Sequence, residues 1–125
     1  MKTLDEIKQR YQTFGDAVID NIYYQISNND KVTSKSLAVC MTCLNLQMDQ
    51  WEKVKIEFVN VKCLRFVETV KIQNAIVFEA LLKQCDDKVI VDFFPIQVDG
   101  QGKLEEDPNS SFAIHCTALT CEVLS

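Results

Sequence analysis

Residues 53–58, KVKIEF, alternate lysine or glutamate with apolar side chains along their whole length. Val54, Ile56 and Phe58 therefore share one parity, and the charged residues share the other. Successive side chains of a β-strand point to opposite faces, so this alternation predicts a strand with one buried face and one face in water. A strand of this kind needs neighbours, and the chain on both sides of it supplies them.

Most of the chain after Gly15 is rich in Val, Ile, Phe and Tyr, which favours further strands. The expected strands cover residues 18–26, 35–48, 53–58, 64–66, 88–94 and 112–123, with a turn at 27–31. Residues 35–48 are apolar on both faces over part of their length, which predicts a central strand covered on both sides. Changes of parity near Asn60 and near Thr117 predict a turn or bulge at each.

Residues 75–84 fit either a helix stripe or the first arm of a hairpin. Asp86-Asp87 followed by the apolar run 88–94 is typical of a hairpin, and we favour that interpretation. Pro95 is expected to end a strand or to lie at a sheet edge. Residues 99–109 are predicted to form the longest loop, because they contain two glycines, a proline and an acidic run.

One amphipathic helix is predicted at the N-terminus. Its apolar stripe recurs at spacings of three and four residues and consists of Leu4, Ile7, Tyr11 and Phe14. Thr3 and Glu6 have the spacing of a capping box, and Gly15 stands where a left-handed residue would end the helix. So short a helix is expected to pack by its apolar stripe on the sheet.

The predicted fold is therefore a single α+β domain, residues 1–125, with the N-terminal helix packed on a curved sheet. The sheet is expected to be a mostly antiparallel meander of six to seven strands. No βαβ alternation is visible, which argues against a doubly wound nucleotide fold.

Composition restricts the class of protein. The chain has 125 residues, 47% of them hydrophobic and 25% charged, which is typical of a globular domain and excludes a disordered tail or a membrane span. Its net charge is −5, which makes it a poor candidate for binding nucleic acid. Residues 1–83 carry eleven basic and ten acidic side chains, whereas residues 84–125 carry two and eight. The C-terminal third could thus steer a basic partner, or its acidic run could simply be a solvated loop.

The cysteines give no support to a metal site. Cys40 and Cys43 form a C-x-x-C, but residues three apart in a strand point to opposite faces and cannot bind one ion. Cys116 and Cys121 have the same mismatch of parity. The N-terminus opens on a charged helical pattern without a signal peptide, so we expect a cytoplasmic protein with reduced, structural thiols.

Catalytic residues are not assigned by the sequence either. His115 is the only histidine, and its neighbour Cys116 points to the other face of the predicted strand. A pair with Cys121 or another distant thiol stays open. Two carboxylate pairs, Asp86/Asp87 and Glu105/Glu106, lie in predicted turns, where such residues are common. We therefore expect no enzyme, no cofactor and no metal.

Four segments carry a resemblance to a known group of proteins. They are WEKVKIEFVNV at 51–61, LRF at 64–66, VDFFP at 91–95 and SFAIHC at 111–116. Together they resemble small β-rich bacterial immunity proteins, the cytoplasmic antidotes encoded beside polymorphic or contact-dependent toxins. The resemblance implies a catalytically inert protein that binds the C-terminal domain of a cognate toxin and occludes its active site.

Many toxins of this kind are nucleases with basic clefts, which an acidic surface would attract. We therefore predict a contact surface formed by the acidic residues of the C-terminal third, namely Asp86, Asp87, Asp92, Asp99, Glu105, Glu106 and Asp107. The expected partner is a protein, not nucleic acid or a membrane, and a homodimer is possible. The alternative is a small ligand-binding or dimeric accessory module that uses an open sheet face. An enzyme built on Cys121 or His115 ranks third.

Overall fold

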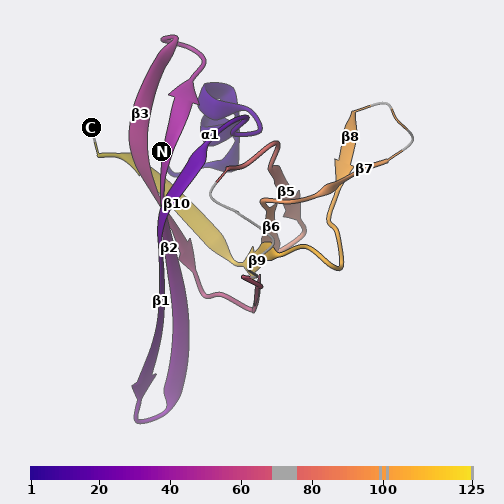
Figure 1. The fold of residues 1–125 in the computed structure, drawn as a ribbon. Helices are drawn as coiled ribbons and strands as arrows, with labels where there is room; N and C mark the ends of the chain where they lie inside the picture. The colour runs from indigo at the N-terminus through magenta and orange to yellow at the C-terminus, as the bar shows by residue number, and fades with distance from the viewer. Residues whose placement is uncertain (69–75, 99, 101, 125) are drawn as a thin grey trace.

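The computed structural model describes residues 1–68, 76–98, 100 and 102–124 (Figure 1). Over these residues the fold is mostly β, with one short helix packed on sheet and ten strands in three antiparallel sheets. The prediction of an N-terminal helix on antiparallel sheet is confirmed. The prediction of one meander of six to seven strands is wrong, because the chain bends sharply at two points and divides the strands between separate sheets.

The first sheet contains residues 53–58 and the strands that pair around them. Its order is β1 (Val18–Asn29), β2 (Val32–Asn45), β3 (Gln50–Val59) and β10 (Ala118–Val123). Val54, Ile56 and Phe58 of β3 are all buried, as their alternation predicted. β1 and β2 form a long hairpin, and its outer part extends beyond β3, whose pairing with β2 begins at Leu37. Figure 1 shows this arm projecting from the lower end of the molecule.

The second sheet has the order β4 (Cys63–Phe66), β9 (Phe112–Cys116), β6 (Lys88–Asp92) and β5 (Leu81–Cys85). β5 and β6 form a hairpin whose turn is Asp86-Asp87, as favoured, but its first arm begins only at Leu81, and residues 76–80 are not part of it. The first residue of the ambiguous segment, Ala75, lies outside the described residues. β7 (Ile96–Val98) and β8 (Lys103–Glu105) form a separate two-stranded sheet. The expected loop at 99–109 thus contains a strand, and Pro95 separates β6 from β7 as predicted.

The two larger sheets meet where the predicted changes of parity occur. β3 leads into β4 through Asn60, which has a positive φ of 52°, and β9 leads into β10 through Thr117. The Asn60 side-chain amide donates to the Thr117 hydroxyl at 3.3 Å, and the Thr117 amide donates to the carbonyl of Val59 at 3.1 Å. Both bends therefore lie side by side. At each break in alternation, the chain leaves one sheet and enters the other.

A single core joins both sheets and the helix. α1 (Leu4–Tyr11) buries Ile7 and Tyr11 against side chains from the inner faces of the sheets. Its capping box is confirmed, because the amide of Glu6 donates to the Thr3 hydroxyl at 3.2 Å. The assignment of Gly15 as the left-handed terminator is wrong, since the helix already ends at Tyr11 and Gln12 takes the positive φ.

β2 is covered on one face only, which corrects the prediction of a strand buried on both sides. Leu37, Val39 and Met41 are buried, whereas Ala38 and Cys40 are only half-buried on the outer face of the first sheet. Near the turn to β3, the same face carries Leu44, which is half-buried and lies opposite the exposed Trp51.

Candidate functional site

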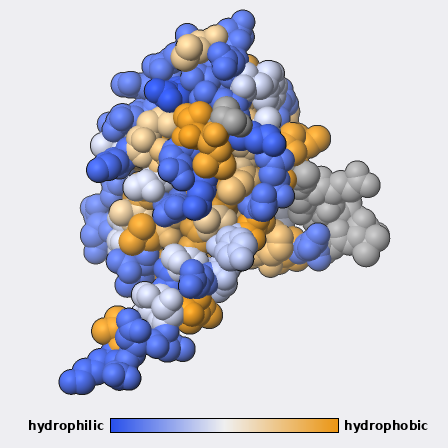
Figure 2. Space-filling view, turned by 90° about the vertical axis from the view of Figure 1, so that its left-hand side faces the viewer, coloured by the Kyte–Doolittle hydropathy of each residue, from blue (hydrophilic) through white to orange (hydrophobic). Residues whose placement is uncertain are grey.

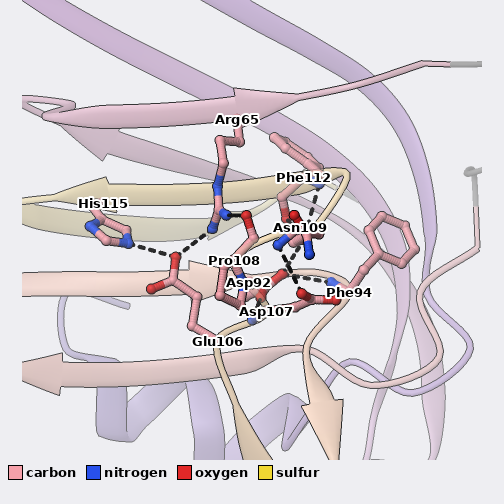
Figure 3. A network of polar contacts seen from close by, with 10 residues as sticks. Arg65, Asp92, Phe94, Glu106, Asp107, Pro108, Asn109, Phe112 and His115 are labelled. Atoms are coloured by element: carbon pink, nitrogen blue, oxygen red, sulfur yellow. Dashed lines mark hydrogen bonds and ion pairs between the residues drawn. The ribbon is translucent and has the colours of Figure 1, made fainter.

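A polar network lies on the outer face of the second sheet, under the segment 106–110 that follows β8 (Figure 3). It contains several of the residues that the sequence predicted as a contact surface. β4, β9 and β6 are neighbours in this sheet, so they bring together side chains that are far apart in the sequence. Figure 3 shows the segment lying across these strands, with the Glu106 carboxylate directed toward Arg65 and His115.

Asp92 anchors this segment from beneath. Its carboxylate is fully buried and accepts the amide of Phe94 at 2.9 Å and the amide of Asp107 at 2.8 Å. The hydroxyl of Ser110 donates to it as well. A buried carboxylate is tolerated only when donors of this kind replace water. Asp92 therefore cannot be a surface contact residue, and its place in the predicted acidic surface is withdrawn.

Glu106 is held by two cationic or potentially cationic side chains. Its Oε2 lies 2.7 Å from Arg65 Nη2 and 2.7 Å from His115 Nε2. Arg65 also donates to the carbonyl of Pro108, so it fixes the segment at two points. The carboxylate of Glu106 is only about one quarter exposed, and the guanidinium balances its charge. It contributes little to any field that would attract a basic partner.

The other predicted acidic residues take different positions. Asp107 is half-buried, and its carboxylate accepts the amide of Asn109 at 2.8 Å. Asp86, Asp87 and Glu105 are exposed, and none of them forms an ion pair with another described residue. Asp99 lies outside the described residues. The structure thus divides the predicted surface into carboxylates that hold the fold and carboxylates that face the solvent.

A shallow pocket of about 340 Å³ opens beside this network, lined by Cys63, Arg65, Glu106, Pro108 and His115. Cys63 lies directly opposite His115 in the β4–β9 pairing, so both side chains are on the outer face. Cys63 is therefore the distant thiol near His115 that the sequence alone did not identify. The imidazole Nε2 is engaged by Glu106, and no hydrogen bond from Cys63 is present among the described contacts. The spacing of the two residues in the sequence does not show that Cys63 and His115 lie opposite each other, because that depends on how β4 pairs with β9.

Three of the other cysteines considered above, Cys43, Cys116 and Cys121, are buried. Cys116 and Cys121 face the core, and burial raises the pKa of each thiol to about 11. Burial likewise raises the pKa of the Cys43 thiol to about 12, while Cys40 points to the opposite, outer face. Thiols with raised pKa values stay protonated at neutral pH and are poor nucleophiles. Among the described residues, no group of three or more His, Cys, Asp or Glu side chains is arranged to hold a metal ion.

A second network, which the sequence did not predict, closes the turn between β2 and β3. The Tyr11 hydroxyl donates to Glu52 Oε1 at 2.6 Å, and the Asn45 side-chain amide donates to the same oxygen at 3.1 Å. Burial and this hydrogen bond raise the pKa of Tyr11, so the hydroxyl remains a donor. The Asn45 side-chain oxygen accepts two amides of the turn. This network holds α1 against the first sheet and has no exposed reactive group.

Replacing Glu106 with glutamine is expected to lower the free energy of unfolding by about 1 kcal/mol, because the ion pairs are partly exposed. Glu105→Gln is the matched control, since it removes the same charge one residue away from a solvent-exposed position. Urea denaturation followed by circular dichroism measures both. Raising the salt concentration should narrow the difference between them. Equal stabilities at low salt would show that the Glu106 contacts contribute nothing.

The fold and the network define a mostly β domain with a structural polar cluster, and comparison with known proteins adds no family. No family model matches the sequence, and the curated proteins and solved structures that were searched contain no significant match. No helix in the described part of the chain is long and apolar enough to cross a membrane.

Proposed function

We propose that this chain is an immunity-type protein that acts in the cytoplasm, binding a cognate bacterial toxin and neutralising it by occluding its active site. The proposed toxin is a basic nuclease. The observation that carries the proposal is the set of exposed carboxylates Asp86, Asp87 and Glu105, which have no ion-pair partner among the described residues. With a net charge of −5, such groups favour association with a basic surface.

The organisation of the surrounding residues is consistent with a rigid binding protein. Asp92, Arg65 and Glu106 fix the segment that follows β8, so Glu105 projects from an ordered backbone. Asp86 and Asp87 project from a two-residue turn between paired strands. Ordered contact residues lose little conformational entropy when a partner binds, which supports affinity. The segments that carry the resemblance to immunity proteins include VDFFP, whose aspartate is the buried anchor of this region.

The role is tested by co-expressing the tagged chain with the toxin domain encoded beside it. A stoichiometric complex, together with toxicity of that domain when it is expressed alone, would support the antidote function. If the two proteins do not associate, the proposed function is wrong. The experiment requires no assumption about which surface makes the contact.

The contact surface is tested by a triple variant, Asp86→Asn, Asp87→Asn and Glu105→Gln. We expect affinity for the toxin domain to fall more than about tenfold at low salt, chiefly through a slower association rate. The control is Asp5→Asn, Asp30→Asn and Asp49→Asn, which makes the same change of net charge at exposed positions elsewhere. Surface plasmon resonance measures both rates. Equal losses in the two triple variants would overturn the site assignment and leave the immunity role standing.

A second candidate function is a small ligand-binding module, and the outer face of the first sheet favours it. A depression of about 590 Å³ lies there, with Tyr23, Ala38 and Cys40 among the residues on its walls and floor. Lys55 and Glu57 form an ion pair at 3.0 Å within it, so the surface offers both apolar and charged contacts. If no toxin binds, this depression is the place to search for a ligand.

A further inference from the structure

The first sheet has one protected edge and one open edge. At the β10 edge, the Met1 amino group donates to the carbonyl of Cys121 at 2.8 Å, and the Cys121 amide donates to the carbonyl of Met1 at 2.9 Å. At the β1 edge, only the start is covered, by a bridge between Val18 and Ile76. From Asn21 to Asn29, no described residue pairs with the free side of β1. Within the part of the chain that the structure describes, the backbone donors and acceptors of this edge are therefore unpaired.

The open edge lacks the features that usually protect edge strands. Such strands are commonly short, or carry charged side chains or proline that discourage pairing with another chain. β4 and β5, the edges of the second sheet, have four and five residues and contain Arg65 and Lys83. Residues 21–29, NIYYQISNN, contain no charge, proline or glycine. The longest edge in the described fold is thus the one without protection.

The hairpin geometry identifies which backbone groups are free. A two-residue turn, Asp30-Lys31, joins β1 to β2, so Asn29 and Val32 form the hydrogen-bonded pair that flanks it. Along an antiparallel strand, hydrogen-bonded pairs alternate with non-hydrogen-bonded ones. The odd-numbered residues of this segment thus bond to β2. The groups directed outward belong to Ile22, Tyr24, Ile26 and Asn28.

We infer that this edge pairs with the same edge of a second copy of the chain, antiparallel, around a twofold axis at Gln25. This register opposes Tyr24 to Ile26 of the second copy and Ile22 to Asn28 of the second copy, so every outward-directed residue exchanges backbone hydrogen bonds. The two first sheets then form one continuous sheet. The closed twofold arrangement covers both open edges and leaves none for further growth.

Side-chain chemistry favours a second copy over a charged partner. Residues 21–29 are neutral, so they offer nothing that would select the basic surface of a nuclease, and self-pairing opposes no charged side chains within them. The only like charges in this register are Asp20 and Asp30 of the two copies, which meet just outside the paired segment. Tyr24 and Ile26 are 41% and 53% exposed, and the proposed register makes them an aromatic and β-branched cross-strand pair. In Figure 2 the arm projects from the lower end of the body, and hydrophobic atoms interrupt its otherwise hydrophilic surface.

Sedimentation equilibrium of the full chain tests the proposal. We expect a mass that rises with concentration from that of one 14.3 kDa chain to twice that value. Ile26→Lys should raise the dimer dissociation constant more than about tenfold, because it places a charge at each of two symmetric contacts. Val32→Lys is the control, with the same change of charge at an exposed position on β2. A single-chain mass at all concentrations, or equal weakening by both variants, would overturn the proposal.

A cross-linking experiment tests the register independently. Gln25 should face its own copy as a non-hydrogen-bonded pair, in which the Cα atoms lie about 4.5 Å apart, within the range of a disulfide. In a background with the exposed Cys63 changed to serine, Gln25→Cys should give a covalent dimer under mild oxidation. Ser27→Cys, which faces Tyr23 of the second copy in this register, should not. Cross-linking by Ser27→Cys alone, or by neither variant, would overturn the pairing around Gln25. Both measurements are made without toxin, so they do not depend on the proposed function.

Discussion

Replacing Asp92 with alanine is expected to lower the free energy of unfolding by about 3–5 kcal/mol, since charged hydrogen bonds of this kind contribute strongly. The variant leaves the amides of Phe94 and Asp107 and the hydroxyl of Ser110 without their common acceptor. These donors are removed from water by the segment that crosses the second sheet. Chemical denaturation monitored by circular dichroism measures the loss, and proteolysis should cut first within 106–110.

Two further variants test whether the loss of stability in Asp92→Ala comes from the lost hydrogen bonds. Asp92→Asn keeps one acceptor oxygen but turns an amide group toward a donor, so an intermediate loss is expected. Asp87→Ala removes a carboxylate from the exposed β5–β6 turn and should change stability by no more than about 0.5 kcal/mol. If Asp92→Ala is as stable as Asp87→Ala, the buried carboxylate does not anchor the segment.

The second large effect is expected from Phe112→Ala, which should cost about 3–5 kcal/mol by leaving a cavity in the core. The Phe112 ring stacks on Phe93 with centroids 4.8 Å apart and meets the edge of Phe66 at 5.4 Å. Phe112 is the first residue of β9, the strand between β4 and β6. Losing the ring therefore removes packing against β4 and against Phe93, the residue that follows β6. Thermal and urea unfolding measure the change.

Phe78→Ala is the matched control, because the same ring is removed from a position that is 75% exposed. It should alter stability by no more than about 0.5 kcal/mol. Phe112→Leu, which keeps most of the apolar volume, should lose less than the alanine variant. Similar losses for Phe78→Ala and Phe112→Ala would contradict the assignment of Phe112 to the core.

Local patterns predicted the strands of the first sheet, because alternation depends only on neighbouring side chains, but they missed β7 and β8. The breaks at Asn60 and Thr117 were also visible as changes of parity. The sequence did not show that the chain passes from one sheet to the other at these breaks. That passage depends on contacts between residues more than fifty positions apart. Gly15 was assigned to the helix end on intrinsic preference, yet Gln12 takes that conformation, and the stripe residue Phe14 packs in the core beyond the end of the helix.

The candidate site was predicted less well, for a related reason. A run of acidic residues shows where charge is concentrated, but it does not show which carboxylates find donors within the fold. Glu106 meets Arg65 and His115 only because β4 and β9 are paired. Asp92 did carry a local signal, since it stands inside the apolar run VIVDFF, where a charge must be satisfied internally.

The position of the last two strands has a consequence for synthesis of the chain. β9 occupies the interior of the second sheet and β10 forms an edge of the first, so neither sheet is complete until residues 112–123 are available. Because these pairings join distant parts of the sequence, their formation is expected to be slow compared with that of the β1–β2 hairpin. While the ribosome still holds residues 112–123, the hairpin can form but the core cannot close. Until residues 112–123 have left the ribosome, the nascent chain exposes apolar strands, and this is the interval in which it most needs chaperones.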